Sequence, residues 1–264
     1  MKKIMFSFII LTMAFTFGQN KMYIWKNNVI TDSSDITNDL KISFKSASTI
    51  PLDGLVAYYP FNGNANDESG NNNNGTTNGG LTWVVDRFNH PGKAANFNGT
   101  SSYINVLVSS SLQIQSDITL SVWVTSSASQ NNKVIVEKYY GNLNDHGWLL
   151  ETMTDGQPVF EGRDGRGGSS TIKGSGGDIN DNKWHLIVGQ RSGNIWKIYI
   201  DGQHINETNV EGTAGSIESG GDLRIGASKY SVPMQFWNGN IDDIRIYKRA
   251  LSDTEIQALY TEVK

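Results

Sequence analysis

The chain has 264 residues, the length of one large β domain or two small domains, and its lack of cysteine excludes disulfides, thiolate metal sites and thiol catalysis. With 22 basic and 26 acidic side chains the net charge is −4, so the clustered basic surface that binds nucleic acid is not expected. Hydrophobic residues make up 38% of the chain, and 7 Trp, 10 Tyr and 10 Phe can build a core.

Residues 1–18 have the pattern of an export signal. Lys2 and Lys3 precede an apolar run, Ile4–Phe17, and small residues near its end offer a cleavage position before Gln19. The run is too short to span a bilayer, and no later segment approaches the roughly 20 apolar residues that a membrane-spanning helix needs. The sequence therefore predicts a signal peptide, no membrane span, and a protein that is secreted, extracellular or on the cell surface, with the periplasm as an alternative.

The stretch after the signal differs from the rest of the chain. Met22–Trp25 and Val29–Ile30 are short apolar runs at hairpin distance, and Leu40–Phe44 is a further candidate strand. About 25 residues cannot bury an independent core. Residues 19–44 are therefore predicted to form a short β-hairpin module, and residues 45–52, rich in Ser, Ala and Thr, are predicted to be a linker.

Short alternating or apolar runs, separated by Gly, Asn, Asp and Ser, dominate the remaining sequence. Along Ile118–Thr125 every second residue from Ile118 is apolar and the others are polar around a single Trp, as in a sandwich strand. Many short strands with turns at roughly 8–12-residue spacing favour an all-β antiparallel sandwich or jelly roll. The residues predicted to face its interior are Leu120, Val122, Val124, Ile187, Ile198 and Ile225. The candidate strands are Leu55–Phe61, Ala94–Phe97, Tyr103–Val108, Ile118–Thr125, Lys133–Lys138, Gly147–Thr152, Pro158–Arg163, Lys183–Gln190, Ile195–Ile200, Asp222–Ala227 and Gly239–Tyr247.

One helix is predicted, at Asp253–Glu262. Ser252 and Glu255 form an S-x-x-E capping box, and Ile256 and Leu259 fall on one face of the helix. Because the helix is short and amphipathic, we expect it to pack on the outside of the sandwich.

Three blocks in a fixed order resemble one known family. They are Leu55–Asn71, which reads LVAYYPFNGNANDESGN; Lys183–His185 followed by Lys197–Gly202; and Gly239–Ser252, which reads GNIDDIRIYKRALS. Residues 53–264 thus resemble the laminin-G-like, concanavalin A-like jelly-roll family, whose relatives include pentraxins and legume lectins. The resemblance implies a concanavalin A-like antiparallel jelly-roll sandwich with one short C-terminal helix, and it leaves the N-terminal module outside.

The loop Asn62–Asn71 is rich in amide, carboxylate and hydroxyl oxygens, the ligand types that calcium takes in sets of roughly 6–8. The resemblance implies one structural calcium ion that joins this loop to the Ile-Asp-Asp block near the C-terminus. Carried over residue by residue, it implies Asp67, Asn71 and Asp242 as ligands. The alternative is an Asx-rich turn without an ion, because Asp and Asn side chains bond their own backbone.

Aromatic rings that alternate with polar neighbours are candidates for binding a glycan or a surface glycoconjugate. Proteins bind sugars by covering their C–H faces with rings, while amides and carboxylates take the hydroxyls. For each ring the alternative is that it fills the core. The candidate rings are Trp123, Tyr139, Tyr140, Trp148 and Trp196.

Catalysis by paired carboxylates is not expected from the sequence. A retaining glycosidase needs two carboxyl groups ~5–5.5 Å apart, which on one strand means acids at i, i+2 or i, i+4 on the same face. Glu151 with Asp155 and Glu161 with Asp164 do not form such a pair, and Glu137 is a lone acid. The sequence therefore predicts a secreted, non-catalytic glycan-binding module with a structural calcium ion. The alternatives are a glycoside hydrolase or lyase of concanavalin A-like fold, or a protein-binding adhesion domain.

Overall fold

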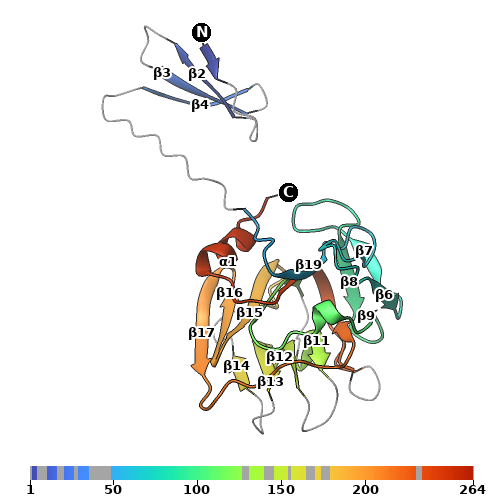
Figure 1. Ribbon diagram of the computed structural model, residues 1–264. Coiled ribbons are helices and arrows are strands. Elements are labelled where there is room, and N and C mark those ends of the chain that lie inside the picture. Colours follow the sequence, from blue (N-terminus) through green and yellow to red (C-terminus); the bar gives the residue numbers. More distant parts are fainter. Residues whose placement is uncertain are drawn as a thin grey trace. The chain divides into compact units, whose positions relative to one another are not determined.

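The computed structural model divides the chain into two compact units, Met1–Ala47 and Ser48–Lys264 (Figure 1). The structure describes residues 2–4, 11–16, 21–26, 29–35, 49–126, 131–139, 146–153, 156–164, 170–173, 179–229 and 234–263. In the first unit β3 and β4 pair where the sequence predicts a hairpin, and the candidate strand Leu40–Phe44 lies outside the described residues. The antiparallel strands of this unit, in spatial order, are β1 (Lys2–Ile4), β2 (Leu11–Thr16), β3 (Lys21–Lys26) and β4 (Val29–Asp35).

The second unit is a sandwich of two antiparallel sheets (Figure 1), which confirms the predicted all-β, concanavalin A-like fold. In spatial order, the eight-stranded sheet consists of β17 (Gln203–Asn209), β16 (Ile195–Ile200), β15 (His185–Ser192), β10 (Ile118–Thr125), β19 (Asn238–Tyr247), β8 (Ala94–Asn98) and β7 (Thr82–Val84), with β5 (Leu55–Tyr59) also paired to β19. The seven-stranded sheet consists of β14 (Ser170–Lys173), β13 (Pro158–Arg163), β12 (Gly147–Thr152), β11 (Lys133–Tyr139), β18 (Leu223–Ile225), β9 (Tyr103–Val106) and β6 (Gly75–Asn78).

Four strands of the sandwich were not predicted, and all four are edge strands. β17 and β7 end the eight-stranded sheet, and β14 and β6 end the seven-stranded one. An edge strand has a neighbour on one side only and is kept short or polar, which limits further pairing. Sequences such as QHINETN in β17 and GTTN in β6 therefore lack the apolar alternation that marks an interior strand.

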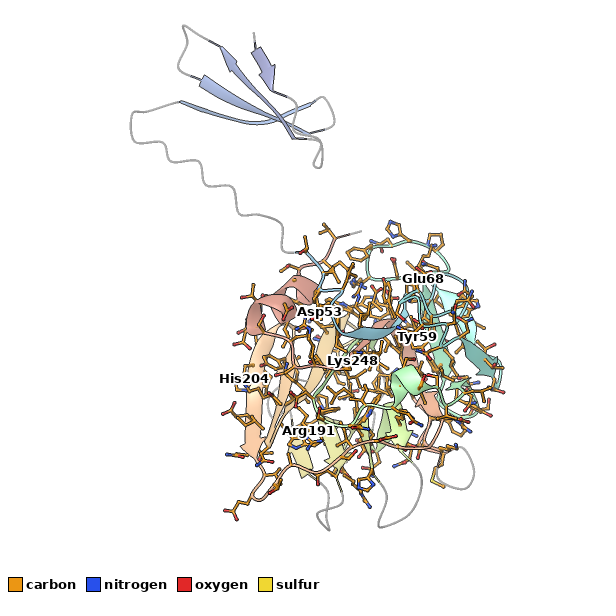
Figure 2. The ribbon with its side chains drawn as sticks, viewed as in Figure 1. Asp53, Tyr59, Glu68, Arg191, His204 and Lys248 are labelled. Atoms are coloured by element: carbon orange, nitrogen blue, oxygen red, sulfur yellow. The ribbon has the colours of Figure 1, made fainter. Side chains whose placement is uncertain are left out.

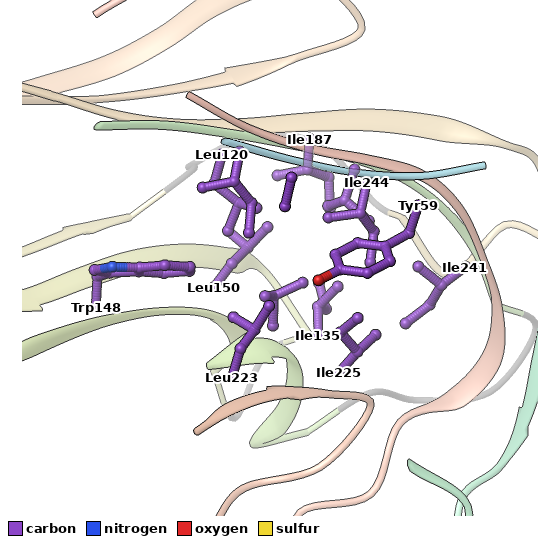
Figure 3. Close-up of a cluster of buried hydrophobic side chains, with 14 of the residues drawn as sticks. Tyr59, Leu120, Ile135, Trp148, Leu150, Ile187, Leu223, Ile225, Ile241 and Ile244 are labelled. Carbon is purple, nitrogen blue, oxygen red and sulfur yellow. The ribbon is translucent and has the colours of Figure 1, made fainter. Parts of the chain in front are cut away.

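The core lies between the two sheets and contains the residues that the alternation assigns to the interior. Leu120 and Ile187 project from the eight-stranded sheet toward Leu150 and Ile225 of the seven-stranded sheet (Figure 3). All six predicted interior residues are fully buried. Side chains from both sheets thus remove a continuous apolar layer from water, which is the main force that holds the sandwich together.

Helix α1 (Asp253–Tyr260) covers part of the outer face of the eight-stranded sheet. The predicted capping box is present, since the Ser252 hydroxyl accepts from the Glu255 N–H and the Glu255 carboxylate accepts from the Ser252 N–H. Ile256 and Leu259 pack with Trp123 and other side chains in a second buried apolar cluster. Among the residues that the structure describes, no helix is long and apolar enough to cross a membrane.

A histidine at the start of β15 joins two loops of this sandwich. His185 Nδ1 lies 2.8 Å from the Asp201 carboxylate, and Nε2 lies 3.0 Å from that of Asp181, which also pairs with Lys183. The hydrogen bonds to Asp201 and Asp181 raise the pKa of His185 above its usual value, against the effect of partial burial. Both ring nitrogens donate only in the imidazolium form.

The pH dependence of stability tests this bridge. When folding raises the pKa of a histidine, the protonated histidine stabilises the folded state. This stabilisation is fully present at a pH below the unfolded-state pKa, near 6.5, and is lost as the pH rises through the folded-state pKa. The melting temperature of wild type should therefore exceed that of His185→Gln at pH 6, and the difference should shrink by pH 9. A pH-independent difference for His185→Gln would contradict the imidazolium bridge.

Candidate ligand-binding face

The two sheets of the sandwich present different outer faces. Trp123, Tyr199 and Tyr247 of the eight-stranded sheet are buried beside helix α1. On the seven-stranded sheet, a Cβ at Gly162 would meet a core ring of the opposite sheet, so its strand neighbour Glu161 points outward. The outward positions of this sheet carry both polar side chains, such as Glu161, and apolar ones, such as Leu149, and we call this surface the outer face.

A row of in-register residues from five strands crosses the outer face. Glu161 on β13, Leu149 on β12 and Glu137 on β11 lie directly opposite one another. The row continues through Arg224 on β18 to Asn105 on β9. Since neighbouring strands lie about 4.8 Å apart, the row is roughly 20 Å long. It is acidic at one end and combines a guanidinium with an amide at the other.

The acidic end holds three carboxyl groups from adjacent strands. Glu151 follows Leu149 by two residues on β12, so strand alternation puts it on the same face as Glu137 and Glu161. Burial raises the pKa of Glu151 to about 7, and the negative charges of Glu161 and Glu137 add to the shift. Burial also raises the pKa of Glu137, which accepts a hydrogen bond from the Lys229 N–H at 2.9 Å. Near neutral pH this end can therefore donate as well as accept hydrogen bonds.

The other end of the row positions a guanidinium. Arg224 Nε donates to Asn105 Oδ1 at 2.8 Å, and its guanidinium carbon lies 4.5 Å from the centre of the Tyr103 ring. Asn105 Nδ2 donates to Asp222 Oδ2 at 3.3 Å, and Lys229 Nζ lies 3.6 Å from the same oxygen. Partly exposed ion pairs contribute little to stability, so the main effect of these contacts is to fix the orientation of Arg224.

Three of the rings predicted to bind a glycan are buried. Trp148 and Trp196 are 1% and 0% exposed in the core between the sheets, and Trp123 is 6% exposed and stacked on Tyr260. In this arrangement none of them offers an open ring face to a sugar, which does not fit the predicted role. Trp148 and Trp196 are buried because the two sheets pack together, and Trp123 is buried because the C-terminal helix covers it. Alternation along a strand does not reveal either kind of packing.

The two predicted tyrosines have different positions. Tyr139 is two residues after Glu137 on β11 and pairs with Gly147, so its backbone position belongs to the outer face. Tyr140 lies outside the described residues. Glycan binding through these two residues stays a prediction.

Asp67, a predicted calcium ligand, anchors the loop that carries Glu68 (Figure 2). Asp67 Oδ1 accepts hydrogen bonds from the backbone N–H groups of Tyr58 and Ser69, both at 2.9 Å. Asp67 Oδ2 accepts from the Asn73 N–H at 2.9 Å and from the Ser69 hydroxyl at 3.0 Å. Both carboxylate oxygens are thus engaged by donors of the chain.

The other two predicted ligands also have partners in the chain. Asn71 Nδ2 donates to the Val56 carbonyl at 3.2 Å. Asp242 Oδ2 lies 3.1 Å from Arg87 Nη1, and Asp242 Oδ1 accepts from the Asp243 N–H. With a guanidinium against one carboxylate and four donors on the other, the residues as placed do not fit a calcium ion. Within the described ranges, no group of three or more His, Asp or Glu could hold a metal ion.

Replacing Asp67 by asparagine tests its anchoring role. In EDTA, Asp67→Asn should lower the free energy of unfolding by about 2–3 kcal/mol, because hydrogen bonds to a buried carboxylate are lost. The melting temperature should fall by roughly 4–12 °C. Glu68→Gln, an exposed acid-to-amide change in the same loop, should stay within about 0.5 kcal/mol of wild type.

The same melting experiment also tests the calcium prediction. If Asp67 only anchors the turn, millimolar calcium should change neither wild type nor Asp67→Asn. A rise of several degrees in wild type that is absent in Asp67→Asn would instead establish the predicted ion.

The sequence did not indicate that three glutamates meet on the outer face. Acid pairs along a single strand can be recognised from their spacing in the sequence. Glu137, Glu151 and Glu161 instead meet across three neighbouring strands. The available signal was one Glu or more at an outward position in each of three successive strands. This signal becomes informative only when the register between the strands is known, and the sequence alone does not specify that register.

A family model described as the concanavalin A-like lectin/glucanases superfamily, Laminin_G_3, matches residues 98–257, more than half of the chain. The chain belongs to this family. The match confirms the laminin-G-like resemblance of the three sequence blocks. None of the curated proteins matches the chain.

Solved structures share the laminin-G-like fold at low sequence identity. The binding domain of Paraclostridial Mosquitocidal Protein 1 has a TM-score of 0.64 and 23% identity over 79% of this chain and 52% of that domain. A second structure is domain 4 of AbnA, a GH43 extracellular arabinanase from Geobacillus stearothermophilus, in complex with arabinotriose. Its TM-score is 0.59, and its sequence identity is 21% over 78% of this chain and 98% of that domain. The botulinum neurotoxin serotype G binding domain has a TM-score of 0.62 and 18% identity over 78% and 50%. The chain spans about half the length of the two toxin domains.

Proposed function

We propose that the protein is a non-catalytic carbohydrate-binding module and that its binding surface is the outer face of the seven-stranded sheet. The observation that carries the proposal is the row from Glu161 to Asn105, which lines up charged and amide groups from neighbouring strands on one face. The opposite outer face of the sandwich is partly covered by α1. The domain of similar fold from an arabinanase, solved in complex with arabinotriose, supports a saccharide ligand.

The chemistry of the row suits sugar hydroxyls. Carboxylates accept from them, the Arg224 guanidinium donates to them, and Asn105 belongs to a residue type that does both. Tyr103 adds a half-buried ring at one end, and Tyr139 occupies a backbone position on the same face. A ligand lying across the strands would meet the partly exposed members of the row, which neighbouring strands hold about 4.8 Å apart, whereas Glu137 in its middle is 4% exposed.

A glycan array followed by calorimetric titration tests the proposal. Wild type should bind at least one glycan, and Glu161→Gln and Tyr103→Ala should each weaken that binding about ten-fold or more. The control is Glu207→Gln, an acid-to-amide change on β17 of the other sheet. Absence of binding to any glycan, or equal losses in the control, would overturn the assignment.

A glycoside hydrolase of the same fold is the second candidate, and one observation favours it. Glu151, with a pKa raised to about 7 beside Glu137 and Glu161, has the protonation behaviour of a general acid. For a binding module we expect no release of reducing ends from polysaccharide panels. Turnover that Glu137→Gln or Glu151→Gln abolishes would replace the binding module by the hydrolase.

Export completes the proposal, and calcium binding stays an untested prediction. Lys2, Lys3 and the apolar run after them support a signal peptide over residues 1–18 and a secreted or surface location. N-terminal sequencing of protein recovered outside the cytoplasm should then begin at Gln19, and a chain beginning at Met1 would contradict export by this signal. A calcium ion at Asp67 would first have to displace the donors of the chain.

A further inference from the structure

Arg224 has an unused donor at a well-defined position on the outer face. Its Nε is held by Asn105 at 2.8 Å, and its guanidinium stacks 4.5 Å from the centre of the Tyr103 ring. Within the described residues, Nη1 is buried and has no hydrogen-bond partner. A buried donor without an acceptor is unfavourable, and an anionic oxygen removes that penalty with a charge-assisted hydrogen bond.

The acids nearest to Arg224 are engaged elsewhere. Glu137, its neighbour in register, accepts from the Lys229 N–H, and burial favours its protonated form. Asp222 accepts from Asn105 and from the Val108 N–H and lies near Lys229 Nζ. No ion pair joins Arg224 to any carboxylate in the described part of the chain.

We infer that Arg224 binds an anionic oxygen group of the glycan, either a carboxylate or a sulfate ester. This inference rests on the proposed function. Because Nε is bonded to Asn105, the contact to such a group would start from Nη1, and a charge-assisted hydrogen bond to an anionic oxygen is stronger than one to a hydroxyl. At the other end of the row, Glu161 already lies 3.7 Å from Arg163, and burial raises the pKa of Glu151 to about 7, so among the described residues this end offers no open guanidinium to a second anion. The face therefore prefers a saccharide with an acidic group at one end over a uniformly charged polyanion.

Side-chain NMR tests the subsite without knowledge of the full ligand. In 15N-labelled protein, the Arg224 Nε–H resonance, assigned with Arg224→Lys, should shift on titration with glucuronate or glucose 6-sulfate and stay unchanged with glucose. A response to only one anion identifies a carboxylate or a sulfate ester as the group bound. An equal response to glucose, or none to either anion, would overturn the inference.

Affinity ratios give the second measurement. For a bound glycan available in neutral and singly acidic forms, wild type should prefer the acidic form at least ten-fold, and Arg224→Gln should abolish that preference. Lys197→Gln, which removes a positive charge from β16 of the other sheet, should leave the ratio unchanged. If folded Arg224→Gln kept the same preference for the acidic over the neutral glycan, the anion subsite would be refuted, whereas the proposed glycan binding would still hold. An NMR response to anions without binding to any glycan would refute the proposed function instead.

Discussion

Arg87→Gln is expected to lower the free energy of unfolding by about 3–5 kcal/mol, the cost of breaking a buried ion pair from one side. Arg87 lies 3.1 Å from Asp242 and also pairs with Asp243 and Glu262. Asp242 and Asp243 are 1% and 0% exposed, so neither can regain water when the guanidinium is removed. The guanidinium also lies 4.5 Å from the centre of the Trp123 ring, a contact that the variant loses.

Urea unfolding and thermal melting measure this loss. The melting temperature should fall by roughly 6–20 °C. Adding Asp243→Asn to Arg87→Gln should recover part of the loss, because one of the two buried carboxylates that lose the Arg87 guanidinium is then neutral. Lys197→Gln, at a partly exposed ion pair, serves as the control and should change stability by less than about 1 kcal/mol. A loss of that small size for Arg87→Gln would show that the carboxylates find other partners or solvent.

Trp196→Ala is expected to cost a similar 3–5 kcal/mol, through a cavity in the core. The Trp196 ring occupies the space above Gly162, where an added Cβ would lie 1.8 Å from it, and packs 5.4 Å from the centre of the Phe160 ring. The indole is fully buried, and its Nε1 has no hydrogen-bond partner in the described residues. Trp196→Phe should therefore cost less, since it restores part of the volume without leaving a polar atom unpaired.

Stability and binding measured on the same variants decide the role of this residue. Denaturant midpoints should rank wild type above Trp196→Phe and Trp196→Ala last. Glycan affinity of the folded fraction should stay near that of wild type. Unchanged stability with a selective loss of affinity would instead return Trp196 to the role of a binding ring.

The sequence by itself determined the elements with strong local patterns. Alternation along Ile118–Thr125 placed its apolar residues in the core, and the capping box at Ser252 marked the start of the helix. Both signals come from residues close in the chain, so no partner is needed to interpret them. The same locality explains why edge strands such as β17 were missed, since little of their side-chain surface is buried.

Only the tertiary structure decided which outward residues are open and which are covered. Trp123 alternates with apolar neighbours as a binding ring would, yet it lies beside α1, far along the chain. Glu137 and Glu161 are 24 positions apart and meet only through the register of β11, β12 and β13. Arg87 and Asp242 are 155 positions apart, and their contact turns a predicted calcium ligand into half of a buried ion pair. Register and long-range pairing depend on how whole strands bury their apolar faces together, which no local pattern specifies.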